Sequence, residues 1–259
     1  MASNLNELRS SQLHHIMRLA VGARRAELVE YLWQTSAGTV QAGPFQGMKL
    51  PNRTAWGDGD IGVRILGCYE QELWAHFKAA FARPYRTVVN VGCAEGYYAV
   101  GSARAMPQAH VHALDISPLA QDVCRAAATL NGVGERVTVG GVATPEVLVN
   151  LLSGPGPRLL LMDCEGAEET LLDPVRVPQL ASSDFMVECH DFAKPGITAE
   201  LRRRLAPTHQ LTDVFEGPRD PNTYAPLRGM PSLDRWIIVC ENRPCTMNWL
   251  VGRAHNSQA

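Results

Sequence analysis

From residue 86 onward, short apolar runs alternate with stretches whose apolar residues recur every three or four positions. Seven runs rich in apolar and β-branched residues predict strands, at 87–91, 110–115, 136–139, 158–163, 184–189, 209–215 and 236–240. The stretches between most of them predict helices. This alternation predicts an α/β fold with a Rossmann-like, seven-stranded, mostly parallel sheet and helices on both of its faces. Because no clear helix separates the last two runs, we expect these to form an antiparallel pair at one sheet edge.

The first 82 residues follow a different pattern. Residues 4–34 have helical spacing, with Asn4 as an N-cap and a break at Val21-Gly22. Residues 36–62 carry many glycines and prolines, which predict an ordered loop or a short hairpin. We therefore expect an α-helical and loop extension over residues 1–82, serving as a lid or a homodimer face. The Rossmann-like domain then spans residues 83–259.

Charge and composition narrow the class of protein. The chain has 24 basic and 26 acidic side chains, a balance that argues against binding to a nucleic-acid backbone. Its seven cysteines include no CxxC pair, which argues against a zinc framework or a disulfide scaffold. No stretch approaches the roughly 18 apolar residues of a membrane span, and the N-terminus lacks a signal-peptide pattern. We expect a cytoplasmic protein that does not enter a membrane.

Two features at the ends of the first two predicted strands indicate a nucleoside ligand. Gly92 and Gly96 follow the first strand and let the backbone approach a ligand and turn into a helix. Ala94 stands where a dinucleotide fingerprint has its second glycine, which disfavours a nicotinamide dinucleotide. Asp115 ends the second strand about 20 residues later, the spacing at which a carboxylate accepts hydrogen bonds from ribose hydroxyls.

Three segments carry a family resemblance. Residues 88–100, Asp115 and residues 159–168 resemble the class I S-adenosylmethionine (SAM)-dependent methyltransferases. The segment Asp163-Cys-Glu-Gly-Ala-Glu168 resembles the motif of the FkbM-like branch of that family, whose best-known members methylate hydroxyl groups. The resemblance implies SAM as the cofactor and O-methylation of a small-molecule acceptor.

The resemblance also implies a set of cofactor-binding residues. Asn90 stands where the family usually has an acid, and it would have to hold the cofactor's amino group as a neutral acceptor. The other expected cofactor contacts are made by Gly92, Glu95, Gly96, Asp115, Ile116, Gly141, Val142 and Asp163.

Polar residues at the ends of the fourth and fifth predicted strands are candidates for catalysis. His190 is the expected general base for a hydroxyl nucleophile, with Asp163 and Asp191 as supporting groups and Glu188 as another group able to orient it. A second interpretation is a divalent metal bound by Asp163, Glu188 and His190, although we do not expect a metal.

Three alternative functions stay open at this point. The first is N-, C- or S-methylation of a small molecule, or methylation of a protein or RNA site. The second is a dehydrogenase with a nicotinamide cofactor, which Ala94 opposes. The third is a module that binds the cofactor without catalysis, which Asn90 leaves open.

Overall fold

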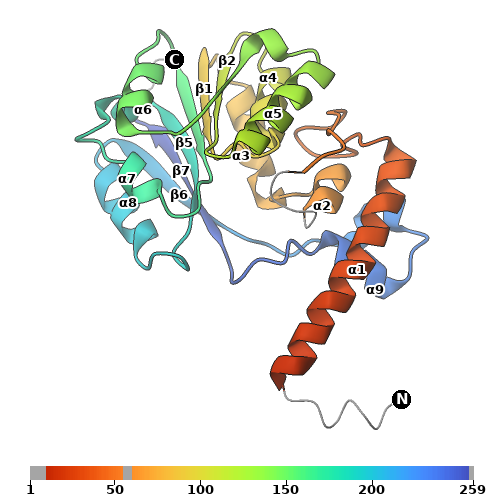
Figure 1. Ribbon diagram of the computed structural model, residues 1–259. Coiled ribbons are helices and arrows are strands. Elements are labelled where there is room, and N and C mark those ends of the chain that lie inside the picture. Colours follow the sequence, from red (N-terminus) through yellow and green to blue (C-terminus); the bar gives the residue numbers. More distant parts are fainter. Residues whose placement is uncertain (1–9, 55–59, 257–259) are drawn as a thin grey trace.

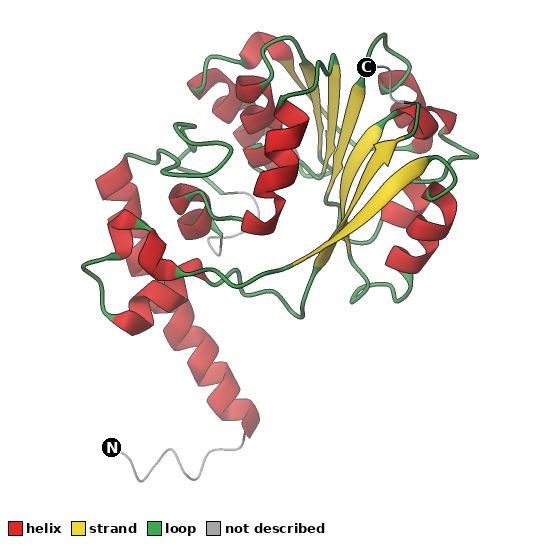
Figure 2. Ribbon diagram, turned by 180° about the vertical axis from the view of Figure 1, so that it is seen from behind, coloured by secondary structure: helices red, strands yellow, loops and turns green. Residues whose placement is uncertain are grey.

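A single seven-stranded sheet forms the centre of the computed structural model, which describes residues 10–54 and 60–256 (Figures 1 and 2). The strand order is β3-β2-β1-β4-β5-β7-β6. β1 to β5 pair in parallel, and β7 is antiparallel to both β5 and β6. This confirms the predicted α/β fold. The strands are β1 (Thr87–Val91), β2 (His110–Leu114), β3 (Val137–Gly140), β4 (Arg158–Met162), β5 (Asp184–Cys189), β6 (His209–Phe215) and β7 (Asn248–Ala254).

Helices cover both faces of the sheet (Figure 1). The alternation of side chains along β1 shows the reason, because Val88 packs into one apolar core and Val89 and Val91 pack into the other. The first face carries α3 (Trp74–Phe81), α4 (Tyr97–Ala105) and α5 (Pro118–Leu130), and the second carries α6 (Pro145–Leu151), α7 (Glu168–Leu171) and α8 (Ile197–Leu205). Short 3₁₀ turns lie at Gln71–Leu73, Gly134–Arg136, Pro178–Ser182, Pro221–Thr223 and Ala225–Leu227.

A third, smaller core joins the N-terminal helices to a late segment of the chain. α1 (Ser10–Ser36) and α2 (Ile61–Leu66) pack with α9 (Ser232–Val239), which lies between β6 and β7 in the sequence (Figure 1). Leu32 and Ile238 are buried in this core, and Arg24 forms an ion pair with Asp234 at 2.7 Å. The N-terminal helices and the segment between β6 and β7 therefore stabilise each other beside the sheet.

The N-terminal segment also contributes to the main core. Phe45 and Phe77 pack edge to face at 5.1 Å, and Phe45 makes a similar contact with Tyr97 of α4. Such aromatic pairs add stability beyond the burial of their surface. The segment before the sheet is thus held firmly against α4, at the side of the molecule where the first strand ends.

Two sequence-based predictions of secondary structure are wrong. The apolar run 236–240 is not a strand, since its residues up to Val239 belong to α9; the seventh strand is Asn248–Ala254. α1 also continues through Gly22 without the predicted break, while the predicted N-cap, Asn4, lies outside the described residues. No helix among the described residues is long and apolar enough to cross a membrane.

Candidate functional site

The loop after β1 is held close to the end of β4. A Cβ atom on Gly92 would lie 1.5 Å from the carbonyl oxygen of Asp163, so a side chain at this position has no space. Gly92 also has a φ of 75°, in the left-handed region that favours glycine. The glycine therefore allows the first and fourth strands to bring their ends together, which places Asp163 beside the loop.

Asp115 fixes the same loop from the end of β2. Its Oδ2 accepts a hydrogen bond from the Ala94 backbone N–H at 2.9 Å, and its Oδ1 accepts one from the Ser117 N–H at 2.8 Å. The residue is 5% exposed and faces a cavity. Because each carboxylate oxygen can accept more than one hydrogen bond, Asp115 still has acceptor capacity for a ligand hydroxyl.

A cavity of about 430 Å³ opens at the carboxyl ends of β1, β2 and β4. The strand order changes direction between β1 and β4, and ligands of open α/β sheets bind at such a point. Five of the expected cofactor residues line this cavity: Gly92, Asp115, Ile116, Val142 and Asp163. Asp60, Arg64 and Tyr69 line it as well, from the N-terminal segment, and the sequence analysis did not assign these three residues to cofactor binding.

Four expected cofactor residues do not line this cavity: Asn90, Glu95, Gly96 and Gly141. Asn90 is 1% exposed, and neither its amide nitrogen nor its amide oxygen has a hydrogen-bond partner among the described residues. Glu95 accepts a hydrogen bond from Arg64 at 2.6 Å, and the guanidinium of Arg64 lies 4.7 Å from the ring centre of Tyr69. Glu95 thus holds in place the side chain of Arg64, which lines the cavity.

A second cavity, of about 180 Å³, adjoins the first. Asp60, Tyr69, Asp163 and Glu165 line both of them. The second cavity is further lined by Glu188, His190, Phe192, Glu241, Asn242, Arg243, Pro244 and Met247. Two ligands could therefore meet at Asp163 and Glu165.

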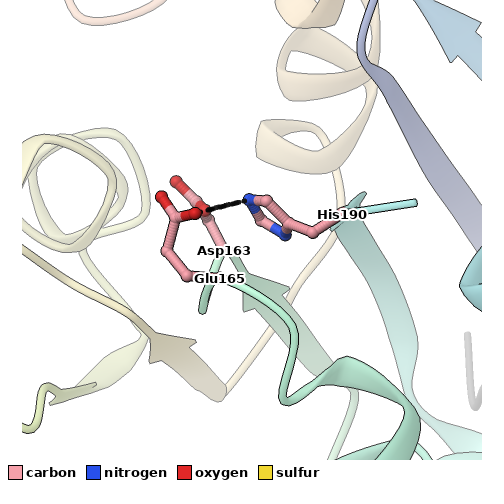
Figure 3. A group of neighbouring side chains, drawn as sticks. All are labelled: Asp163, Glu165 and His190. Atoms are coloured by element: carbon pink, nitrogen blue, oxygen red, sulfur yellow. Dashed lines mark ion pairs between the residues drawn. The ribbon is translucent and has the colours of Figure 1, made fainter. Parts of the chain in front are cut away.

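Four carboxylates lie around His190 beside this junction, and Figure 3 shows two of them, Asp163 and Glu165, at one edge of its ring. Its Nδ1 is 2.6 Å from Oε1 of Glu168, a residue that is fully buried. Its Nε2 lies 3.4 Å from an oxygen of Asp163, 3.4 Å from one of Glu188 and 3.6 Å from one of Glu165. The imidazole is 2% exposed, and Glu168 and Glu188 are buried with it, whereas Glu165 reaches it from the solvent side.

The carboxylates determine the charge of His190. Burial alone would lower its pKa, but the hydrogen bonds to Glu168 and Glu188 and the charge of Asp163 raise the pKa of His190 to about 11. Burial, together with the charge of Glu188, raises the pKa of Asp163 well above its usual range. These carboxylates therefore favour a positive charge at His190, carried by the imidazole proton when no cation is bound beside it, and a protonated imidazole cannot act as the expected general base.

Asp191 points away from the cluster. Its Oδ1 accepts a hydrogen bond from the Gly196 N–H at 2.9 Å, and its Oδ2 accepts one from the Thr198 hydroxyl. These bonds organise the start of α8, so the Asp191 carboxylate has a role in the local fold, and its hydrogen bonds go to Gly196 and Thr198 and not to the His190 ring.

Sequence reasoning missed a buried ion network beneath the second cavity. Arg243 forms ion pairs with Glu70, Glu188 and Glu241, and Glu70 also accepts a hydrogen bond from the Tyr98 hydroxyl. Glu70 comes from the turn before α3 and Arg243 from the loop before β7, so no local spacing connects them. Both residues stand in polar stretches of the sequence, at 69–72 and 241–243, so no local signal marks them as buried.

Two groups of side chains among the described residues have the composition and spacing of a metal site. They are Asp163 with Glu165 and His190, and Glu70 with Asp163 and Glu188. Within each group the potential ligand atoms all lie within 4.8 Å of one another. The alternative set expected from the sequence, Asp163 with Glu188 and His190, is spread over these two groups.

Comparison with known proteins gave matches among solved structures alone. No protein-family model matches the chain, and no curated protein matches it. The O-methyltransferase TomG from Streptomyces achromogenes, solved with SAM, is 13% identical over 71% of this chain and 79% of its own, with a TM-score of 0.49. An O-methyltransferase from Bacillus cereus in complex with SAH is 13% identical over 88% and 91%, also with a TM-score of 0.49.

A third matching structure is that of a C-methyltransferase. The geranyl diphosphate C-methyltransferase from Streptomyces coelicolor A3(2) is 12% identical over 89% of this chain and 97% of its own, with a TM-score of 0.45.

Proposed function

We propose that this protein is a SAM-dependent methyltransferase that acts on an oxygen of a small-molecule acceptor. One observation carries the proposal. The cavity at the switch point of the sheet, lined by the Gly92 loop and Asp115, adjoins a second cavity through Asp163 and Glu165. A donor and an acceptor can therefore occupy neighbouring sites with their reacting atoms at the shared wall, as methyl transfer requires.

The residues of the larger cavity fit SAM. Asp115 would accept hydrogen bonds from the ribose hydroxyls, and the exposed side chains of Ile116 and Val142 would pack on the adenine. Arg64 and Asp60 offer opposite charges to the carboxylate and the ammonium of the methionine part. Ala94 in the loop after β1 replaces the glycine that a pyrophosphate needs, which disfavours a dinucleotide in this cavity.

The smaller cavity is where the acceptor would bind. When bound, SAM supplies a methyl group on a positively charged sulfur. The acceptor oxygen forms a bond to the methyl carbon, the sulfur–carbon bond breaks with its electron pair on sulfur, and the hydroxyl proton leaves. Asp163 and Glu165, which line both cavities, are the carboxylates of this chain that lie where the proton must be withdrawn.

Methyl transfer can be measured with SAM that carries a trideuterated methyl group. The full-length protein is incubated with hydroxyl-bearing and amine-bearing small molecules, and products are sought by mass spectrometry. We expect the labelled methyl on a hydroxyl oxygen, with formation of S-adenosylhomocysteine. Binding of SAM without any turnover would instead support the non-catalytic module, and transfer to nitrogen would correct the assigned atom.

Three narrower predictions from the sequence remain predictions. They are membership of the FkbM-like branch, which rests on the motif Asp163–Glu168, a cytoplasmic location, and homodimer formation through the N-terminal helix.

A further inference from the structure

We propose that Asp163, Glu165 and His190 bind one divalent metal ion at the junction of the two cavities. The site itself is argued from geometry, whereas the role that we give the ion in catalysis rests on the proposed methyl transfer. Figure 3 shows the three side chains converging, with Asp163 and Glu165 following β4 and His190 following β5.

The orientation of His190 is the first argument. Glu168 is fully buried and lies 2.6 Å from Nδ1, so this edge of the ring is occupied and Nε2 faces Asp163 and Glu165. A carboxylate on the far nitrogen is the usual partner of a histidine that ligates a metal, because it fixes the tautomer and the ring orientation. Glu168 supplies that partner here.

The distances on the other side of the ring are the second argument. Nε2 lies 3.4 Å from Asp163 and 3.6 Å from Glu165, which exceeds the roughly 2.7–3.2 Å of a direct N–H···O hydrogen bond. Two ligands that each lie about 2.0–2.2 Å from one ion are separated by at most about 4.4 Å. The three side chains are thus spaced as ligands of a shared ion would be.

Charge is the third argument. Four carboxylates surround the imidazole of His190, namely Asp163, Glu165, Glu168 and Glu188. Arg243, the cation that also lines the smaller cavity, is engaged with Glu70, Glu188 and Glu241. Because Arg243 already pairs with Glu188, we assign the metal to the other two carboxylates and the histidine. A metal ion would take the place of the proton on Nε2 of His190 and offset the mutual repulsion of the carboxylates.

The donor set indicates the kind of ion. One imidazole nitrogen with two carboxylates suits an ion that accepts both nitrogen and oxygen ligands, such as Mn²⁺ or Zn²⁺, better than Ca²⁺ or Mg²⁺. Three protein ligands leave coordination positions for an acceptor hydroxyl. A hydroxyl bound there would have a lowered pKa, and its proton would pass to water as the oxygen becomes nucleophilic. The ion would thereby replace the general base that the sequence assigned to His190.

Metal binding can be measured without any acceptor. Chelator-treated full-length protein is titrated with MnCl₂ and followed by electron paramagnetic resonance, and ZnCl₂ binding is measured by calorimetry. We expect one ion per chain, with affinity reduced at least about tenfold in His190→Gln and Glu165→Gln and about 10–100-fold in Glu168→Gln. The matched control is Glu146→Gln, which removes an exposed carboxylate on α6 and should leave binding unchanged.

The outcomes separate this proposal from the proposed function. Each variant is first tested for a wild-type circular dichroism spectrum and for SAM binding, so that a loss of the fold is recognised. The side chain of Glu165 is exposed, so its replacement should not disturb the packing. No binding of Mn²⁺ or Zn²⁺ at millimolar concentrations, or binding that His190→Gln and Glu165→Gln leave unchanged, would overturn the metal site. SAM binding in the same protein would leave the methyltransferase proposal standing.

Discussion

The carboxylate of Asp115 accepts the backbone N–H of Ala94, and this bond ties the end of β2 to the loop that follows β1. A residue expected to bind the ribose therefore also shapes the loop against which the cofactor would lie. The two roles are connected, because the same carboxylate faces the cavity. Changes at Asp115 should consequently affect both ligand affinity and the stability of the loop.

Asp115→Asn should weaken SAM binding at least about tenfold. The amide replaces one acceptor oxygen by a donor, which would face the N–H of Ala94 or Ser117, and a lost hydrogen bond to a charged group costs about 1.5–3 kcal/mol. Calorimetric titration with SAM measures the effect. Asp122→Asn, at an exposed position of α5, is the control. Equal affinities for wild type and Asp115→Asn would contradict the ribose-binding role.

Gly92→Ala should lower the free energy of unfolding by more than about 2 kcal/mol, because the methyl group would overlap the carbonyl of Asp163 in a backbone conformation unfavourable to alanine. Urea denaturation gives the value. Gly141→Ala is the matched control, since the nearest atom to its Cβ would be 4.0 Å away and stability should change by less than about 0.5 kcal/mol. Similar stability of the two variants would show that the ends of β1 and β4 are not packed as described.

Asn90→Leu should raise the free energy of unfolding by about 1 kcal/mol. The buried amide of Asn90 has no hydrogen-bond partner among the described residues, and an apolar side chain of similar shape removes that cost. SAM affinity should stay the same, since Asn90 does not line the cavity. A large loss of SAM affinity in a folded variant would restore the role in cofactor binding that the sequence suggested.

Arg243→Met should lower the free energy of unfolding by about 3–5 kcal/mol, because it leaves the buried carboxylates of Glu70, Glu188 and Glu241 without their shared cation. Arg203→Met is the control, since Arg203 pairs with Glu200 at an exposed position of α8. Thermal unfolding of both variants tests the difference. Equal melting temperatures would mean that the network beneath the smaller cavity contributes little to stability.

The sequence predicted the parallel part of the sheet because β1 and β4 are apolar and nearly wholly buried, which is a local property. It failed at residues 236–240, where an equally apolar run forms the end of α9 and buries Ile238 and Val239 against the N-terminal helices. Only that tertiary contact distinguishes the run from a strand.

The candidate site was likewise predicted only in part, because the sequence reveals local features and not tertiary contacts. Asp115 and Asp163 follow strands, so the topology places them at one edge of the sheet. Arg64, Tyr69 and Arg243 come from distant segments, and only the packing of those segments brings them to the cavities. His190 was found, but its protonation depends on carboxylates whose approach no spacing reveals, Glu168 among them.

Calorimetric titration of the wild-type protein with SAM, and separately with NADH, tests the central claim most directly. We predict that one SAM binds per chain and that NADH neither binds nor displaces it, because Ala94 occupies the position where a dinucleotide needs glycine. Binding of NADH in place of SAM, or of neither ligand, would contradict the assignment of the larger cavity to the methyl donor.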